Sequence, residues 1–191
     1  MTPKVKEGEI RFVLDWPNGP NDLDIYSYFK ISKLLKCTVF FGKRECPGVN
    51  LENDSSENDS SGEVITINQL GNYTYTFAVN KYIDSSNNTA LGDNPVEGFI
   101  IPKRVNRFNY TLPDNPLSQS EAKISVYSFD YIGPVAQISV NSKQNDSDKL
   151  NWWLSFCLNG SKGINSLSVV NKLFSERPQF NFCENYFMNM S

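Results

Sequence analysis

The chain has 191 residues, of which 39% are hydrophobic and 13% aromatic, a composition typical of one folded domain with a substantial core. Its net charge of -3 and isoelectric point near 5.1 give no overall electrostatic attraction for nucleic acid or an anionic membrane, and no apolar run approaches the roughly 20 residues of a spanning helix. Histidine is absent. The commonest general base and the usual zinc ligand are therefore missing, and we do not expect an enzyme.

Strand patterns dominate the chain. The segment EIRFVLDW alternates apolar and other residues with the period of a half-buried strand. Seven later segments are rich in β-branched and aromatic residues and are bounded by turn-forming residues: LDIYSYF, CTVFF, EVITI, NYTYTFAVNKYI, AKISVYSF, VAQISV and NWWLSFCL. Eight short strands predict an all-β, antiparallel β-sandwich. Only ISKLLK, residues 31–36, has a helical pattern, long enough for a single turn.

Two long polar stretches interrupt the strands. Residues 43–62 include the duplicated tract NDSS, and residues 84–106 are too long for a hairpin turn. Because long loops inside a compact domain are usually functional or inserted, we interpret both as insertions in a single sandwich domain covering residues 1–178. Residues 179–191 form a short C-terminal extension.

The four cysteines can form two disulfide bonds in three ways. Cys37 and Cys46 bracket a strand and a turn at Gly42, so a local bridge between them is geometrically easy. Cys157 would then pair with Cys183 and hold the extension against the last aromatic strand. The alternative is four free buried thiols in a cytosolic protein.

Eight Asn-x-Ser/Thr sequons favour the oxidising alternative. About 3.4 are expected by chance from the 23 asparagines and 28 serines and threonines of the chain. We therefore expect a secreted, extracellular protein that carries N-linked glycans, although MTPKVKEGEI has no apolar signal-peptide core. The predicted glycosylation sites are Asn53, Asn58, Asn72, Asn87, Asn109, Asn145, Asn159 and Asn189.

A cluster of carboxylates is the candidate metal site. On a strand, Asp22 and Asp24 point the same way, and Glu52 and Asp54 could approach them from the facing loop, with Glu63 as a further neighbour. Such an oxygen-rich set would suit calcium. Alternatively, these carboxylates cap turns or pair with nearby basic side chains.

In their order, several segments resemble the YfaP-like family of uncharacterised secreted β-sandwich domains. They are RFVLDWPNGPNDLDIY, CTVFFGKRECPG, LENDSSENDSSGEVITI, LGNYTYTFAVNKY, LSQSEAKISVY, WWLSFCLNG and GINSLSVVNKL. The resemblance covers about residues 8–178. It implies a transthyretin- or immunoglobulin-like sandwich with no established enzymatic activity, but the padded loop after Glu52 departs from the family pattern.

The expected function is structural or adhesive. We predict a homo-oligomer, a protomer of an extracellular filament or surface coat, in which a terminal strand completes the exposed sheet edge of a neighbouring copy. The alternatives are a calcium-dependent module that binds carbohydrate or protein, and a carboxylate-dependent glycan hydrolase. Trp152 and Trp153 face opposite ways on a strand, which predicts one core residue and one surface or interface residue.

Overall fold

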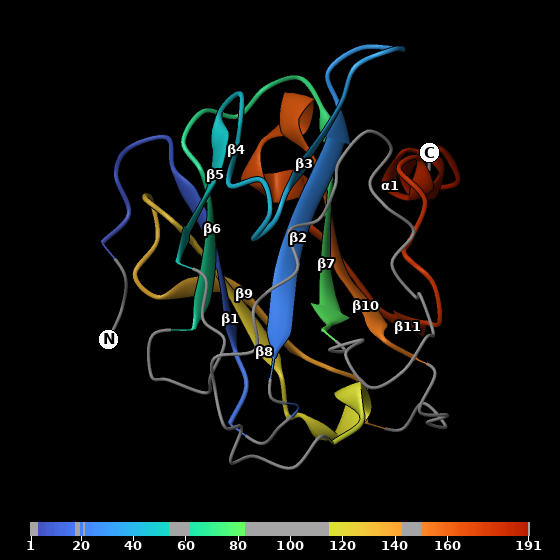
Figure 1. The fold of residues 1–191 in the computed structure, drawn as a ribbon. Helices are drawn as coiled ribbons and strands as arrows, with labels where there is room; N and C mark the ends of the chain where they lie inside the picture. The colour runs from blue at the N-terminus through green and yellow to red at the C-terminus, as the bar shows by residue number, and fades with distance from the viewer. Residues whose placement is uncertain are drawn as a thin grey trace.

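The fold is an antiparallel sandwich of two β-sheets, described from a computed structural model. The structure describes residues 4–17, 20, 22–53, 62–82, 115–142 and 150–190. One sheet has six strands in the order β4-β5-β6-β1-β8-β9, and the other has five in the order β11-β10-β7-β2-β3 (Figure 1). The predicted all-β sandwich is confirmed.

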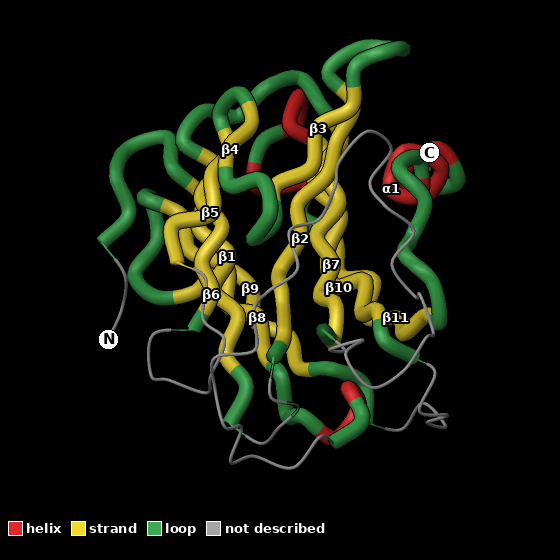
Figure 2. Tube along the Cα trace, in the orientation of Figure 1, coloured by secondary structure: helices red, strands yellow, loops and turns green. Residues whose placement is uncertain are grey.

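Every strand pairs antiparallel with its neighbours, and the helical segments lie outside the two sheets (Figure 2). The six-stranded sheet contains β1 (Ile10–Asp15), β4 (Glu45–Cys46), β5 (Val49–Asn53), β6 (Glu63–Ile67), β8 (Lys123–Ser128) and β9 (Pro134–Ser139). The five-stranded sheet contains β2 (Leu23–Lys30), β3 (Lys36–Val39), β7 (Thr74–Lys81), β10 (Trp152–Asn159) and β11 (Ser168–Phe174). The helical segments are η1 (Leu117–Gln119), η2 (Gly160–Lys162), η3 (Ile164–Ser166) and α1 (Phe182–Met188).

Two local expectations need correction. Residues 45–53 of the expected 43–62 insertion contain the strands β4 and β5, and residues 31–35 form a hairpin turn and not a helical turn. Two further elements were not expected from the residue pattern: the strand β11 and the helix α1 of the C-terminal extension. The predicted insertion at 84–106 lies outside the described residues.

The space between the sheets holds the main core. β1 shows strict alternation, with Ile10, Phe12 and Leu14 buried and the intervening residues half-buried, because only one face of this strand meets the core. Phe12 stacks on Phe77 of the opposite sheet at 3.6 Å between ring centroids. This contact joins the two sheets at the centre of the sandwich.

The central strands of the five-stranded sheet, β2, β7 and β10, are buried on both faces. On the face away from the main core, Tyr26 contacts Trp152 edge-on at 4.9 Å and stacks on Phe40 at 5.3 Å. Phe180 of the C-terminal extension covers Tyr28 at 5.2 Å between centroids. We call this group the outer aromatic cluster; its buried members are Tyr26, Tyr28, Phe40, Ala78, Trp152 and Leu154, with Phe174, Phe180 and Phe182 packed against them.

A β-bulge in β10 decides which of its residues face each cluster. The register with both neighbouring strands shifts between Leu154 and Phe156, and the extra residue, Ser155, donates its hydroxyl to the Phe77 carbonyl. Without the bulge, Cys157 would share the inner face with Trp153. With it, Phe156 joins Trp153 in the main core, and Cys157 points toward the C-terminal extension.

Candidate functional site

The structure separates the residues of the predicted metal site. Asp22 and Asp24 are buried at the start of β2 in the five-stranded sheet. Glu52 lies on β5 in the six-stranded sheet, where its carboxylate is 3.3 Å from the Arg11 guanidinium. The described residues do not bring this glutamate to the two aspartates, which fits the ion-pair alternative for Glu52.

The neighbouring carboxylate Glu63 lies nearer to β2. Its Oε2 accepts a hydrogen bond of 2.7 Å from the backbone N–H of Ile25, which ties β6 to the opposite sheet. Asp54 lies outside the described residues. Within the described ranges no group of three or more carboxylate or cysteine side chains has an arrangement that could hold a metal ion, and calcium binding stays a prediction.

Both predicted disulfides are present. Cys37 on β3 bonds to Cys46 on β4, with 6.2 Å between the Cα atoms, so this bridge joins the edges of the two sheets as well as closing the turn at Gly42. Cys157 on β10 bonds to Cys183 on α1, and both residues are fully buried. No described cysteine is a free thiol.

Half of the predicted glycosylation sites fall on described residues. Asn72 and Asn189 are exposed, whereas Asn53 and Asn159 are half-buried and take part in local hydrogen bonds. The Asn159 side-chain oxygen accepts from Ser161 N–H at 3.1 Å and caps η2. The other four, Asn58, Asn87, Asn109 and Asn145, lie outside the described residues.

A pocket of about 560 Å³ lies where the chain leaves β11 and turns into α1. Its volume is within the range of small-molecule binding sites, about 300–1,000 Å³. Four side-chain amides line it together with three aromatic residues and one charged residue of each sign: Gln179, Asn181, Asn185, Asn189, Phe174, Phe182, Tyr186, Glu176 and Arg177. Ser175 and Pro178 complete the wall.

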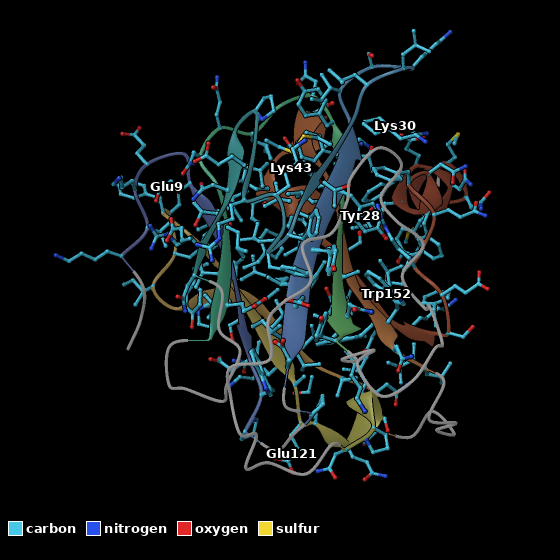
Figure 3. All side chains as sticks on the ribbon, viewed as in Figure 1. Glu9, Tyr28, Lys30, Lys43, Glu121 and Trp152 are labelled. Atoms are coloured by element: carbon cyan, nitrogen blue, oxygen red, sulfur yellow. A yellow bond between two sulfur atoms is a disulfide. The ribbon has the colours of Figure 1, made fainter. Side chains whose placement is uncertain are left out.

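The C-terminal disulfide and an ion pair fix the helical wall of this pocket. The Cys157–Cys183 bond attaches α1 to β10, and Lys30 Nζ donates to Glu184 Oε2 at 2.9 Å. Figure 3 shows Lys30, Tyr28 and Trp152 along the side of the molecule that holds α1. Because both attachments lie on the same short helix, the wall is held in place before any ligand binds.

Arg177 connects the pocket to the outer aromatic cluster. Its guanidinium carbon is 5.1 Å from the centroid of the Tyr28 ring and 4.9 Å from that of Phe180. Burial lowers the pKa of Arg177 from its usual value, and nearby Tyr28 and Tyr26 partly offset this shift. The Arg177 guanidinium therefore contacts two aromatic rings of the outer aromatic cluster and also lines the pocket.

Sequence reasoning missed this pocket, although one signal for it was available. Asn181, Asn185 and Asn189 recur every four residues and therefore lie along one side of a helix. The sequence analysis assigned no secondary structure to the C-terminal extension and therefore did not use this periodicity.

Comparisons with known proteins assign no function to the site, so its interpretation depends on the chemistry of its own residues. No protein-family model, curated protein or solved structure matches the chain. Among the described residues, no helix has the length and apolar character that crossing a membrane requires.

Proposed function

We propose that the chain is a secreted adhesive module that binds a carbohydrate in the pocket beside α1. One observation carries the proposal: four side-chain amides, an arginine, a glutamate and three aromatic residues line a single pocket of about 560 Å³. The proposal keeps the adhesive function expected from the sequence and moves the binding site from the predicted carboxylates to the C-terminal extension.

The lining suits sugar chemistry in two respects. Each amide offers a hydrogen-bond donor and an acceptor, as a sugar hydroxyl does, so a row of amides can bind neighbouring hydroxyls without a net charge. The aromatic residues Phe182 and Tyr186 supply apolar surface for the C–H faces of a pyranose ring. A purely apolar ligand would leave the amides unpaired, at a cost of about 1–3 kcal/mol for each buried group.

Calorimetry with a defined panel of sugars tests the proposal. The probes are disaccharides of glucose, galactose, mannose and N-acetylglucosamine, titrated into the full chain. Asn185→Ala should weaken binding about fivefold, corresponding to one lost hydrogen bond of about 1 kcal/mol. Asn165→Ala, at an exposed asparagine of η3 that does not line the pocket, is the matched control. Binding that is absent for the whole panel, or equally strong in both variants, would contradict the proposal.

The sequon at Asn189 needs its own variant, because an attached glycan would stand at the pocket. Ser191→Ala removes this sequon and leaves the Asn189 amide in place. If a glycan blocks the pocket, the variant produced in a secretory host should bind more tightly than the wild type. Chain produced without glycosylation should bind equally well with either residue at position 191.

Secretion and glycosylation are part of the same proposal, supported by the two disulfides and the excess of sequons. Endoglycosidase treatment of the native protein should lower its mass by several glycan units. An unchanged mass would remove this part of the proposal.

Assembly by strand addition stays a prediction, and three of the four described edge strands give it little support. β4 has two residues, β9 begins with Pro134, and Asn171 in β11 has a left-handed backbone with φ of 52°. Short or interrupted edges are poor templates for an added strand. Filaments in an electron micrograph of the native protein would restore the assembly hypothesis.

A further inference from the structure

The turn between β2 and β3 projects beyond the end of the sandwich (Figures 1 and 2). At its tip, Leu34 is 97% exposed and Leu35 is 55% exposed. Single exposed leucines are ordinary on protein surfaces. Two adjacent exposed leucines at the end of a projecting hairpin are less common, because side chains that stay in solvent add no apolar burial to the folded state.

The turn holds these leucines in place with its own hydrogen bonds. The backbone N–H groups of Ile31 and Ser32 donate to the Leu35 carbonyl at 2.8 and 3.2 Å. The Ser32 hydroxyl oxygen accepts from the N–H groups of Leu34 and Leu35 at 3.3 and 3.1 Å. The tip is therefore a formed turn whose geometry does not depend on packing of the leucines.

Lysines flank the apolar tip. Residues 30–36 contain Lys30, Lys33 and Lys36 and no acidic residue, whereas the whole chain has a net charge of -3. Glu184 pairs with Lys30 at the base of the hairpin. Lys33 is exposed in the turn beside the leucines. Lys36 is also exposed; it lies opposite Lys30 at the base of the hairpin, and its ammonium is 5.2 Å from the centroid of the Phe180 ring. The net charge of the whole chain gave no sign of attraction to an anionic membrane, because it does not reveal a local group of lysines.

We propose that the tip of the β2–β3 hairpin inserts into the interfacial region of an anionic membrane. Leu34 and Leu35 enter the boundary between headgroups and acyl chains, while Lys33 beside them remains at the level of the lipid phosphates. Lys36, at the base of the hairpin, adds positive charge behind the tip. Apolar burial and attraction of lysines to anionic lipid are the two contributions that together give reversible surface binding. The lysine stems are long enough to place their ammonium groups outside the apolar layer.

The shape of the tip favours lipid over a protein partner. A stable protein interface needs about 800 Å² from each side, which a convex turn of a few residues cannot supply. A bilayer surface needs no complementary pocket, because lipids rearrange around the inserted side chains. Basic residues around an exposed apolar tip complement an anionic lipid surface.

A second exposed turn provides a matched control. The β8–β9 turn carries Ile132, which is fully exposed at 109%, together with half-exposed Phe129 and Tyr131. It contains Asp130 and no lysine. Substitutions at Ile132 therefore test whether any exposed apolar turn binds vesicles, or whether only the β2–β3 turn, which is flanked by lysines, does so.

Vesicle sedimentation of the full chain tests the proposal. The probes are phosphatidylcholine vesicles with and without phosphatidylserine, at low and high salt. The wild type should sediment with the anionic vesicles only, and high salt should release it. Replacing both leucines, Leu34→Ser with Leu35→Ser, should lower the partition coefficient about tenfold or more, whereas Ile132→Ser should leave it unchanged. Replacing both lysines, Lys33→Gln with Lys36→Gln, should remove the preference for anionic lipid.

Fluorescence gives a direct measure of insertion. The three native tryptophans, Trp16, Trp152 and Trp153, are at most 5% exposed. An exposed reporter introduced by Leu34→Trp should therefore shift its emission to shorter wavelength when anionic vesicles are added, and one introduced by Ile132→Trp should not. No shift at position 34, a shift at both positions, or unchanged binding after removal of the leucines would overturn the proposal. Sugar binding at the pocket beside α1 is a separate measurement and is expected to be unaffected.

Discussion

Strand β1 of the six-stranded sheet and strands β2 and β10 of the five-stranded sheet bury their outer faces differently. In the six-stranded sheet, β1 alternates between buried and half-buried residues. In the five-stranded sheet, seven of the eight residues of β2 and of β10 are buried, because the outer aromatic cluster and the C-terminal extension cover the second face. A strand covered on both sides loses its period-2 pattern. The five-stranded sheet therefore has the features of a central layer in a three-layer structure.

The largest expected effect comes from truncating an aromatic side chain on each outer face. Trp152→Ala, in the outer aromatic cluster, should lower the free energy of unfolding by about 3–5 kcal/mol, as truncation of a core aromatic residue does. Tyr127→Ala, on the outer face of the six-stranded sheet opposite Arg11, should cost about 1 kcal/mol or less. Urea unfolding measures both. Equal losses would mean that the two outer faces do not differ in this way.

Removing the C-terminal disulfide should have the next largest effect. The Cys157–Cys183 bond closes a loop with a sequence separation of 26, and Cys37–Cys46 one of 9. Loop-closure entropy gives about 3.5 and 2.7 kcal/mol for the two bonds, respectively.

Binding of an apolar dye distinguishes the effects of removing the two disulfides more clearly than the free energy of unfolding does. The double substitution Cys157→Ser with Cys183→Ser should loosen the extension, uncover the outer aromatic cluster and increase binding of an apolar fluorescent dye. Replacing Cys37 and Cys46 in the same way should not. Equal dye binding by both variants would contradict the covering role of the extension.

The smallest effect concerns two buried tyrosines. The Tyr28 hydroxyl, on the outer side of β2, has no hydrogen-bond partner among the described residues. The Tyr75 hydroxyl accepts from Gly71 N–H at 2.9 Å. At neutral pH, Tyr28→Phe should be neutral or stabilising, whereas Tyr75→Phe should cost about 1 kcal/mol. Thermal unfolding of the two variants gives the comparison, and a larger loss at Tyr28 would contradict it.

Alkaline pH should sharpen this result. Burial raises the pKa of Tyr28 above its usual value. An unfolded tyrosine loses its proton near pH 10, while the folded one keeps it to higher pH. The stability associated with Tyr28 is thus fully present below about pH 10 and is lost as the pH rises from there toward the folded pKa. Tyr28→Phe should reduce this alkaline loss, measured as the melting temperature between pH 8 and 11.

Much of the fold could be predicted from residue patterns. The strand EIRFVLDW was identified from its alternation, and the pairing of Cys37 with Cys46 from their position around a turn. The separation of Trp152 from Trp153 onto opposite faces also follows from strand geometry. The prediction of one core residue is confirmed by Trp153, but the prediction that the other would be a surface or interface residue was wrong. Trp152 is 5% exposed because the outer aromatic cluster, and not solvent, occupies its face.

The sequence by itself determined the sandwich, the oxidised cysteines and the absence of histidine chemistry, because alternation, turn residues and composition are local properties of a chain. Tertiary structure decided three further features: the burial of the second face, the bulge at Ser155 that directs Cys157 toward α1, and the pocket lined by four amides. Each depends on what packs against a residue from a distant part of the chain. A one-residue bulge moves every later residue of the strand to the opposite face of the sheet. No local pattern in NWWLSFCL predicts where this bulge occurs.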